Sequence, residues 1–148
     1  MIYLDTSYII KCYVNEPGTG AVLDLLEQTA GRATAAHART EFWSGIHRHF
    51  REGHLTRKQA AEIWRQFGRD EKDGLWQWLP LNDEVVRRSC VVFEALGDSI
   101  FLRSADSLHL ACAAANGFAE IYSSDRHLLK AAAFFGVTAV NVISPSTR

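Results

Sequence analysis

The sequence predicts an α/β protein in which helices cover both faces of a parallel sheet. Three observations predict this fold. Five short apolar or alternating segments have the length of strands. Between them, apolar residues recur three and four positions apart, which is the spacing of a helix with one buried face. The two kinds of segment alternate along the chain, and that order builds a parallel sheet.

The first predicted strand spans residues 2–4, an Ile-Tyr-Leu run that begins one residue after the start of the chain. Its length and its apolar character indicate a buried strand. Thr6 or Ser7 is expected to cap the helix that follows, because a hydroxyl can accept a bond from the first free backbone N–H groups. That helix runs to about Val14 and is broken by the pair Pro17-Gly18.

A second apolar stripe precedes Gly31, and residues 32–36 are predicted to form the second strand. A stronger helix follows, because Phe42, Ile46 and Phe50 recur every four residues. This periodicity places the three side chains on one buried face. The helix is expected to end near Gly53.

Thr56 is expected to cap the next helix, since Thr56 and Gln59 fit the capping-box spacing. This helix runs through Phe67. Residues 75–79 alternate between apolar and polar side chains, and Pro80 ends them. They are therefore predicted to form the third strand.

Asn82 is expected to cap a helix that runs to Leu96, and Ser104 begins another that runs to Gly117. Residues 120–123 form the fourth predicted strand. The last elements are a helix that starts at Asp125, a strand over residues 137–143 and a tail that begins at Ser144-Pro145. Repeats, linkers and low-complexity stretches are not seen.

Length and composition predict one globular domain over residues 1–148. The chain is 47% hydrophobic and 22% charged, which suffices for one core. It contains no apolar run of the roughly 20 residues that span a membrane. Asp5 interrupts the apolar N-terminal segment, so a signal peptide is not expected. These observations predict a cytoplasmic protein without a membrane partner.

The formal net charge is -1, from 16 basic and 17 acidic residues, and such a balance is unusual for a nucleic-acid-binding domain. If four acids gather in one cluster, however, the remaining residues together carry +3. The cysteines, Cys12, Cys90 and Cys112, lie far apart in apolar helical segments. Their spacing fits neither a disulfide framework nor a zinc site, and they are expected to be buried.

Acidic side chains lie where the predicted strands end. Asp5 follows the first strand, Asp125 follows the fourth, and Asp106 lies in the first turn of the helix that leads into the fourth. Ligands of open parallel sheets bind outside the carboxyl ends of the strands. An acid in a helix's first turn also has a structural explanation, because it stabilises the helix dipole. Glu41, which starts another helix beside an apolar face, is the fourth candidate.

Carboxylates that converge on one crevice repel each other, and a bound divalent cation removes that repulsion. Carboxylate oxygens and water are the ligands that Mg²⁺ and Mn²⁺ prefer. A Mg²⁺ ion that keeps some of its water suits phosphoryl chemistry. The acids therefore predict a metal site for this reaction class.

Four segments together resemble the PIN-domain nucleases and, more narrowly, the VapC-type toxins of bacterial toxin–antitoxin pairs. They are Leu4-Asp5-Thr6-Ser7, Glu41 on its helix, Leu102-Arg103-Ser104-Ala105-Asp106-Ser107-Leu108-His109-Leu110-Ala111, and Tyr122-Ser123-Ser124-Asp125-Arg126-His127-Leu128. The resemblance extends from Ile2 to about Val142. It implies a three-layer α/β/α sandwich and a metal-dependent ribonuclease that cleaves RNA as a toxin. It also implies a cognate antitoxin and a homodimer.

The resemblance also implies roles for individual residues. The catalytic acids would be Asp5, Glu41, Asp106 and Asp125, with Asp5 and Asp106 as ligands of Mg²⁺ or of Mn²⁺ in its place. The role of the fourth acid, Asp125, varies within the family. Supporting side chains would be Thr6, Ser7, Ser123 and Arg103. Arg103 would orient a carboxylate or contact the RNA backbone, or else form a simple surface ion pair.

Other residues have two interpretations. His109 lies on the helical face of Asp106 and is expected in the core or behind an acid. The basic residues of segment 37–58 could follow RNA phosphates or lie on a solvated face. The four tryptophans are expected to pack in the core or at an interface, although they could stack on bases. The helix pair over residues 41–68 is a candidate partner surface.

Two further functions use the same residues. A non-catalytic PIN-fold module that binds only a protein would have no reason to gather repelling acids. An aspartyl-phosphate enzyme also places an acid after the first strand, but it would need a second acid next to Asp5, where this chain has Thr6.

Overall fold

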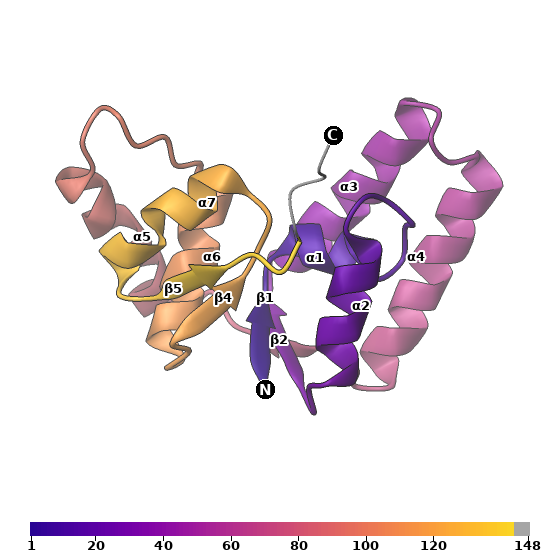
Figure 1. The fold of residues 1–148 in the computed structure, drawn as a ribbon, viewed down its shortest axis with the longest axis horizontal. Helices are drawn as coiled ribbons and strands as arrows, with labels where there is room; N and C mark the ends of the chain where they lie inside the picture. The colour runs from indigo at the N-terminus through magenta and orange to yellow at the C-terminus, as the bar shows by residue number, and fades with distance from the viewer. Residues whose placement is uncertain (144–148) are drawn as a thin grey trace.

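A five-stranded sheet forms the centre of the molecule (Figure 1). The computed structural model describes residues 1–143, so the predicted tail at Ser144-Pro145 lies outside the described residues. The strand order is β3-β2-β1-β4-β5, and every neighbouring pair is parallel. The strands are β1 (Ile2–Leu4), β2 (Arg32–Ala35), β3 (Gln77–Leu79), β4 (Glu120–Tyr122) and β5 (Thr138–Val140). The prediction of a mainly parallel sheet is confirmed.

Helices cover both faces of this sheet, as predicted (Figure 1). One face carries α1 (Thr6–Lys11), α2 (Thr19–Glu27), α3 (Ala38–Arg51) and α4 (Arg57–Lys72). The other carries α5 (Asp83–Ala95), α6 (Ser104–Ala115), α7 (Arg126–Ala131) and the 3₁₀ helix η1 (Ala132–Phe135). None of the helices within residues 1–143 is both long enough and apolar enough to cross a membrane.

The alternation of side chains along β1 divides the core into two halves. Tyr3 packs among the buried residues of α5, α6 and α7, whereas Leu4 packs among those of α1 to α4. In β4, Ile121 packs on the same side as Tyr3, and Tyr122 packs on the same side as Leu4. Successive strand residues point to opposite faces, so a strand between two helical layers must be apolar at nearly every position. This requirement explains why the first predicted strand, residues 2–4, is a continuous apolar run.

Helix α1 begins one residue earlier than predicted, because Asp5 caps it in place of Thr6 or Ser7. Asp5 has extended backbone angles, and its carboxylate accepts the N–H of Tyr8 at 3.2 Å. Thr6 and Ser7 are already helical, and their hydroxyls bond carboxylates instead. The predicted caps of the later helices, Thr56 with its capping box, Asn82 and Asp125, are confirmed.

Several elements are shorter than predicted. The strands predicted over 75–79 and 137–143 keep only three residues each, and helix α1 ends at Lys11 rather than near Val14. The two strands are limited by their neighbours, because β3 pairs with three residues of β2, Ala33 to Ala35, and β5 pairs with the three residues of β4. The last helix continues as η1 and ends at Gly136, whose φ of 72° favours glycine.

The cysteines differ from one another in burial. Cys112 is buried and Cys12 is half-buried, but Cys90 is exposed, so the expectation that all three lie in the core is wrong. Helix α5 turns Val85 and Ser89 toward the core, and the next residue, Cys90, is rotated by about 100° toward solvent.

The strand order creates a switch point at the centre of the sheet. From β1 the chain builds β2 and β3 on one side, and it then returns to build β4 and β5 on the other. Because all strands are parallel, their carboxyl ends lie at one edge. The crevice between the ends of β1 and β4 is therefore the position where such sheets bind ligands. Asp5 and Ser123 are the residues that follow these two strands.

Candidate functional site

A pocket of about 320 Å³ lies at this switch point. All four predicted acids line it, although they come from four separate parts of the chain. The lining residues are Asp5, Thr6, Ser7, Ile10, Glu41, Ser44, Gly45, Arg48, Arg103, Asp106, His109 and Asp125. The tertiary structure thus brings the predicted acids together at one edge of the sheet.

Asp5 is buried at the floor of this pocket and is held by hydroxyl groups on both carboxylate oxygens. Ser7 donates to Oδ1 at 2.7 Å, and Ser123 donates to Oδ2 at 2.5 Å. These two serines therefore hold the carboxylate of Asp5. Burial raises the pKa of Asp5, and the hydrogen bonds from Ser123 and Ser7 offset this only in part. The charge on Asp5 consequently lacks full compensation.

Asp106 and Asp125 are joined by Arg103. Its Nε donates to Oδ2 of Asp106 at 2.7 Å, and one terminal nitrogen donates to Oδ2 of Asp125 at 2.5 Å. Burial raises the pKa of Asp106, while the neighbouring guanidinium of Arg103 lowers it. The Arg103 side chain is 54% exposed. Both sequence-based interpretations of Arg103 are therefore partly correct, because it forms ion pairs at the surface and orients two of the acids.

Glu41 occupies the opposite side of the pocket, in the first turn of α3. Its Oε2 accepts a hydrogen bond from Thr6 at 2.5 Å and lies 2.7 Å from Nε2 of His109. Burial raises the pKa of Glu41, but His109 and Thr6 outweigh burial and bring the pKa down to about 2. His109 is buried behind Glu41, and its Nδ1 lies 3.0 Å from the hydroxyl of Tyr3. The expectation that His109 lies in the core behind an acid is confirmed.

His37, the first residue of segment 37–58, also lies in this region, although the sequence analysis gave it no role beside the acids. Its Nε2 lies 3.5 Å from Oε2 of Glu41 and 3.1 Å from the carbonyl oxygen of Ala105. Burial, followed by the nearby His109, lowers the pKa of His37 to about 4. The available signal was the spacing, because residues four apart on a helix are neighbours. Potential ligand atoms of His37, Glu41 and His109 all lie within 4.8 Å of one another.

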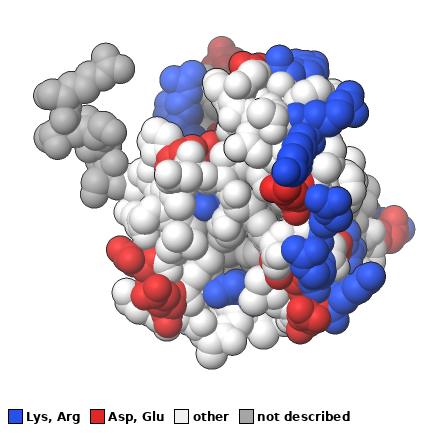
Figure 2. Space-filling view, turned by 90° about the vertical axis from the view of Figure 1, so that its right-hand side faces the viewer, with Lys and Arg blue, Asp and Glu red and all other residues white. Residues whose placement is uncertain are grey.

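The predicted basic residues of segment 37–58 are divided between the pocket and the surface. Arg48 lines the pocket. Arg39 instead pairs with Glu71 at 2.6 Å and lies over the ring of Trp78, and Arg57 lies over the ring of Phe50. Figure 2, which views the α4 side of the molecule, shows Lys and Arg side chains along one side of that face with acidic side chains among them.

The tryptophans are mainly packing residues, as expected, but one of them is exposed. Trp76 is buried, whereas Trp43 is 47% exposed and stacks on Trp64 with ring centroids 5.0 Å apart. This stack joins α3 to α4. It leaves apolar surface on the helix pair that the sequence predicts to be a partner surface.

The chain is similar to known proteins over nearly its whole length. The family model of the PIN domain matches residues 2–134. No curated protein sequence matches the chain.

Solved structures with the same fold include the FitAcB structure from Neisseria gonorrhoeae, with a TM-score of 0.73 at 17% identity over 96% of this chain and 98% of that one. VapC20 of Mycobacterium tuberculosis, described as a sarcin-ricin loop cleaving toxin, has a TM-score of 0.70 at 16% identity over 93% and 99%. VapBC2 of Rickettsia felis, bound to a promoter DNA fragment, has a TM-score of 0.66 at 14% identity over 95% and 98%. At these identities the likeness shows a shared fold.

Proposed function

The chain belongs to the PIN domain family, and from this premise we propose that it is a Mg²⁺-dependent endoribonuclease that acts as the toxin of a toxin–antitoxin pair. One observation carries the proposal. Asp5, Glu41, Asp106 and Asp125 line a single pocket at the switch point of the sheet, although the chain separates them widely. A protein-binding module would gain nothing from this concentration of repelling charge.

The donor groups of the pocket fit a hard divalent cation. Burial raises the pKa of both Asp5 and Asp106, so each ionised carboxylate lacks part of the compensation that a cation would provide. Oxygen donors of this kind suit Mg²⁺, with Mn²⁺ as a substitute. We therefore assign Asp5 and Asp106 as the metal ligands. When bound there, the ion would polarise a phosphoryl oxygen and lower the pKa of a water molecule.

The remaining side chains would position water and phosphate. Thr6, His109 and His37 all contact Oε2 of Glu41, so within residues 1–143 its Oε1 remains available to accept a proton or to hold water. The Arg103 side chain is 54% exposed, so it would be able to release Asp106 and Asp125 and bind a phosphate instead. Arg48 lines the same pocket and would supply a second positive charge. Attack of water on phosphorus breaks the bond to the 3′ oxygen, which leaves a 5′-phosphate and a 3′-hydroxyl.

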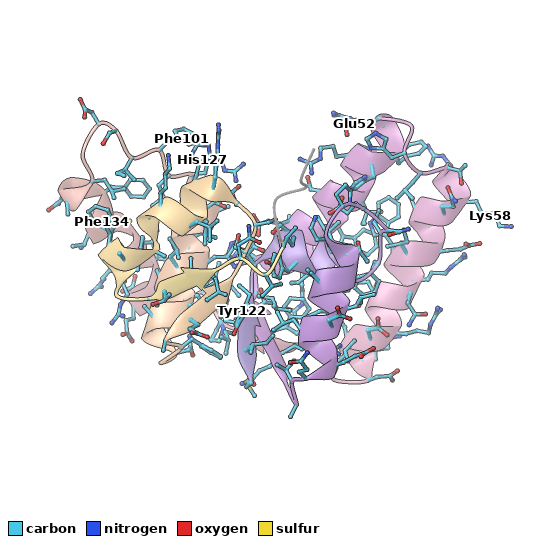
Figure 3. All side chains as sticks on the ribbon, viewed as in Figure 1. Glu52, Lys58, Phe101, Tyr122, His127 and Phe134 are labelled. Atoms are coloured by element: carbon cyan, nitrogen blue, oxygen red, sulfur yellow. The ribbon has the colours of Figure 1, made fainter. Side chains whose placement is uncertain are left out.

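We propose that RNA approaches past Phe101 and His127. Figure 3 shows that both side chains point outward on the same side of the molecule, and their rings lie 4.8 Å apart. Phe101 is 59% exposed and lies two residues before Arg103, while His127 lies two residues after Asp125. Unpaired RNA bases stack on aromatic and histidine rings of this kind. RNA as substrate places the proposed activity in the cytoplasm.

The proposed protein partners are an antitoxin and a second copy of the chain. A groove of about 1110 Å³ lies between the loop after α1 and the pair α3–α4, with Cys12, Pro17, Leu55 and Ile63 among its lining. We propose that the cognate antitoxin binds in this groove. Two structures of the same fold, FitAB and VapBC2, were solved bound to DNA fragments, which supports a toxin–antitoxin assembly. We propose that α5 forms the homodimer interface, because it exposes large apolar side chains: Val91 is 63% exposed and Phe93 is 43% exposed.

The test is RNA cleavage by the purified full chain with and without metal. We expect cleavage with Mg²⁺ or Mn²⁺, none with EDTA, and little with Ca²⁺, whose looser geometry misplaces the water. The ends of the products should carry 5′-phosphates. Full activity in EDTA would exclude the metal mechanism, and a folded chain that cleaves no RNA under any of these conditions would favour the protein-binding module.

A further inference from the structure

Two histidines and one carboxylate converge at the edge of the acidic pocket. Oε2 of Glu41 lies 2.7 Å from Nε2 of His109 and 3.5 Å from Nε2 of His37. The ring centroids of the two histidines are 4.3 Å apart. Two imidazoles and one carboxylate form the donor set of three-ligand zinc sites, in which water takes the fourth position.

We infer that His37, Glu41 and His109 form a binding site for a transition-metal ion of the Zn²⁺ type, distinct in its donor chemistry from the Mg²⁺ site. Bonds of about 2.0–2.1 Å in a tetrahedron separate neighbouring ligand atoms by about 3.3 Å. The two distances to Glu41, 2.7 and 3.5 Å, lie on either side of that separation. The ligand atoms of all three residues lie within 4.8 Å of one another, so small side-chain rotations bring both nitrogens toward tetrahedral positions around one ion.

The surroundings of His109 and Glu41 resemble the outer shell of a metal site. Nδ1 of His109 faces the hydroxyl of Tyr3 at 3.0 Å, so the ring can donate Nδ1–H to Tyr3 while the lone pair of Nε2 faces the ion. Such partners fix the tautomer and the orientation of a ligating histidine. Thr6 holds the carboxylate of Glu41 in the same way, at 2.5 Å.

His37 is held more loosely than His109, which allows it to turn toward an ion. Within residues 1–143, the His37 side chain makes one hydrogen bond, between its Nε2 and the carbonyl oxygen of Ala105. Its buried Nδ1 has no hydrogen-bond partner among these residues. Binding would therefore cost His37 one hydrogen bond.

The shared residue Glu41 links the two sites. Nitrogen donors favour Zn²⁺ over Mg²⁺, so Zn²⁺ would hold Glu41 on the side of the histidines and away from the acids. Zn²⁺ should therefore slow Mg²⁺-dependent cleavage, a consequence that rests on the proposed function, whereas binding of the ion does not.

The test is titration of the full chain, freed of metal by EDTA and dialysis, with Co²⁺ as a spectroscopic substitute for Zn²⁺. We expect one equivalent of Co²⁺ to give the intense visible absorption of a tetrahedral site, and one equivalent of Zn²⁺ to abolish it. His37→Gln should weaken Co²⁺ binding at least about tenfold, and Tyr3→Phe, which keeps the ring, about 10–100-fold. His54→Gln, whose side chain is 62% exposed, is the matched control and should change nothing.

An Asp106→Asn variant separates this site from the proposed function. It should keep the tetrahedral Co²⁺ spectrum, even though it should lose cleavage. The inference is wrong if Co²⁺ gives only the weak spectrum of an octahedral site, if His37→Gln binds Co²⁺ like the unmodified chain, or if Asp106→Asn removes the spectrum. A chain that binds Co²⁺ as expected but cleaves no RNA would retain the inference and reject the proposed function.

Discussion

The carboxylates on the two sides of the pocket shift their pKa values in opposite directions. On the acidic side, Asp5 and Asp106 are buried among hydroxyl groups and one exposed arginine, and the pKa of each is raised. On the histidine side, Glu41 is half-buried, with 29% of its side chain exposed, and His109 and Thr6 bring its pKa down to about 2. Burial raises the pKa of all three carboxyls, so their partners decide the direction of the net shift. The carboxylates of the acidic side therefore lack the compensation that Glu41 receives from His109 and Thr6.

The largest effect should follow from a change on the acidic side. Asp5→Asn keeps the shape of the side chain but removes a charge that the proposed ion needs. We expect cleavage to fall by about 10²-fold or more, and growth arrest on expression in bacteria to disappear. Asp24→Asn, an exposed position on α2, is the control and should stay toxic. Equal growth arrest by Asp5→Asn at equal expression would mean that the acids are not catalytic.

On the histidine side, the low pKa of Glu41 should make the free energy of unfolding depend on pH. The pKa of Glu41 is about 2 in the folded chain against an ordinary value of 4.5, so its ionised form stabilises the fold by about 3 kcal/mol above pH 4.5. This stability is lost as the pH falls from 4.5 toward 2, and about 2 kcal/mol of it should be gone by pH 3.

Urea unfolding in EDTA at pH 6 and pH 3 measures this contribution. Glu41→Gln should be less stable at pH 6 and should lose less stability on acidification than the unmodified chain. Parallel losses in the two proteins would show that the contact between Glu41 and His109 adds nothing to stability.

Asp106→Asn should stabilise the fold at neutral pH, whereas Glu41→Gln should destabilise it. A carboxyl whose pKa is raised in the folded state destabilises the fold when the pH is above that pKa, so the neutral amide should stabilise the EDTA-treated chain. We expect the Tm of the EDTA-treated variant to lie above that of the unmodified chain.

The same variant should not respond to Mg²⁺. The unmodified chain should gain about 2.7 kcal/mol when Mg²⁺ is at 100 times its Kd. Asp83→Asn, which changes an exposed carboxylate of α5, should keep this response. A full response to Mg²⁺ in Asp106→Asn would remove Asp106 from the ligand set.

The smallest effect concerns the direction from which RNA reaches the pocket. If RNA enters on the acidic side, Phe101→Ala should remove one stacked base, worth about 1 kcal/mol, and raise KM about fivefold while kcat is unchanged. Phe134→Ala is the control. Phe134 is also exposed, but Figure 3 shows it at the left edge of the molecule, whereas Phe101 lies at the top. Equal KM values for the two variants would place the RNA path elsewhere.

The local sequence determined the fold class, most helix starts and the positions of three acids. Asp5 and Asp125 follow strands, and Asp106 lies in a helix's first turn, so the rule that parallel strands share one carboxyl edge was enough to predict their convergence. The exact strand ends were not predictable in the same way, since β4 ends where its partner β1 turns away. Register depends on the neighbour and not on the residues of the strand alone.

Only the tertiary structure decided the distant partners of Glu41 and Asp5. His109 is 68 residues from Glu41, and Ser123 is 118 residues from Asp5, so no local pattern links them. Their meeting depends on how α3 and α6 pack at the end of β1, which short-range periodicity does not specify. Because a buried carboxylate takes its pKa from these distant partners, the sequence could place Asp5 and Glu41 in one pocket but could not foresee that their pKa values would shift in opposite directions.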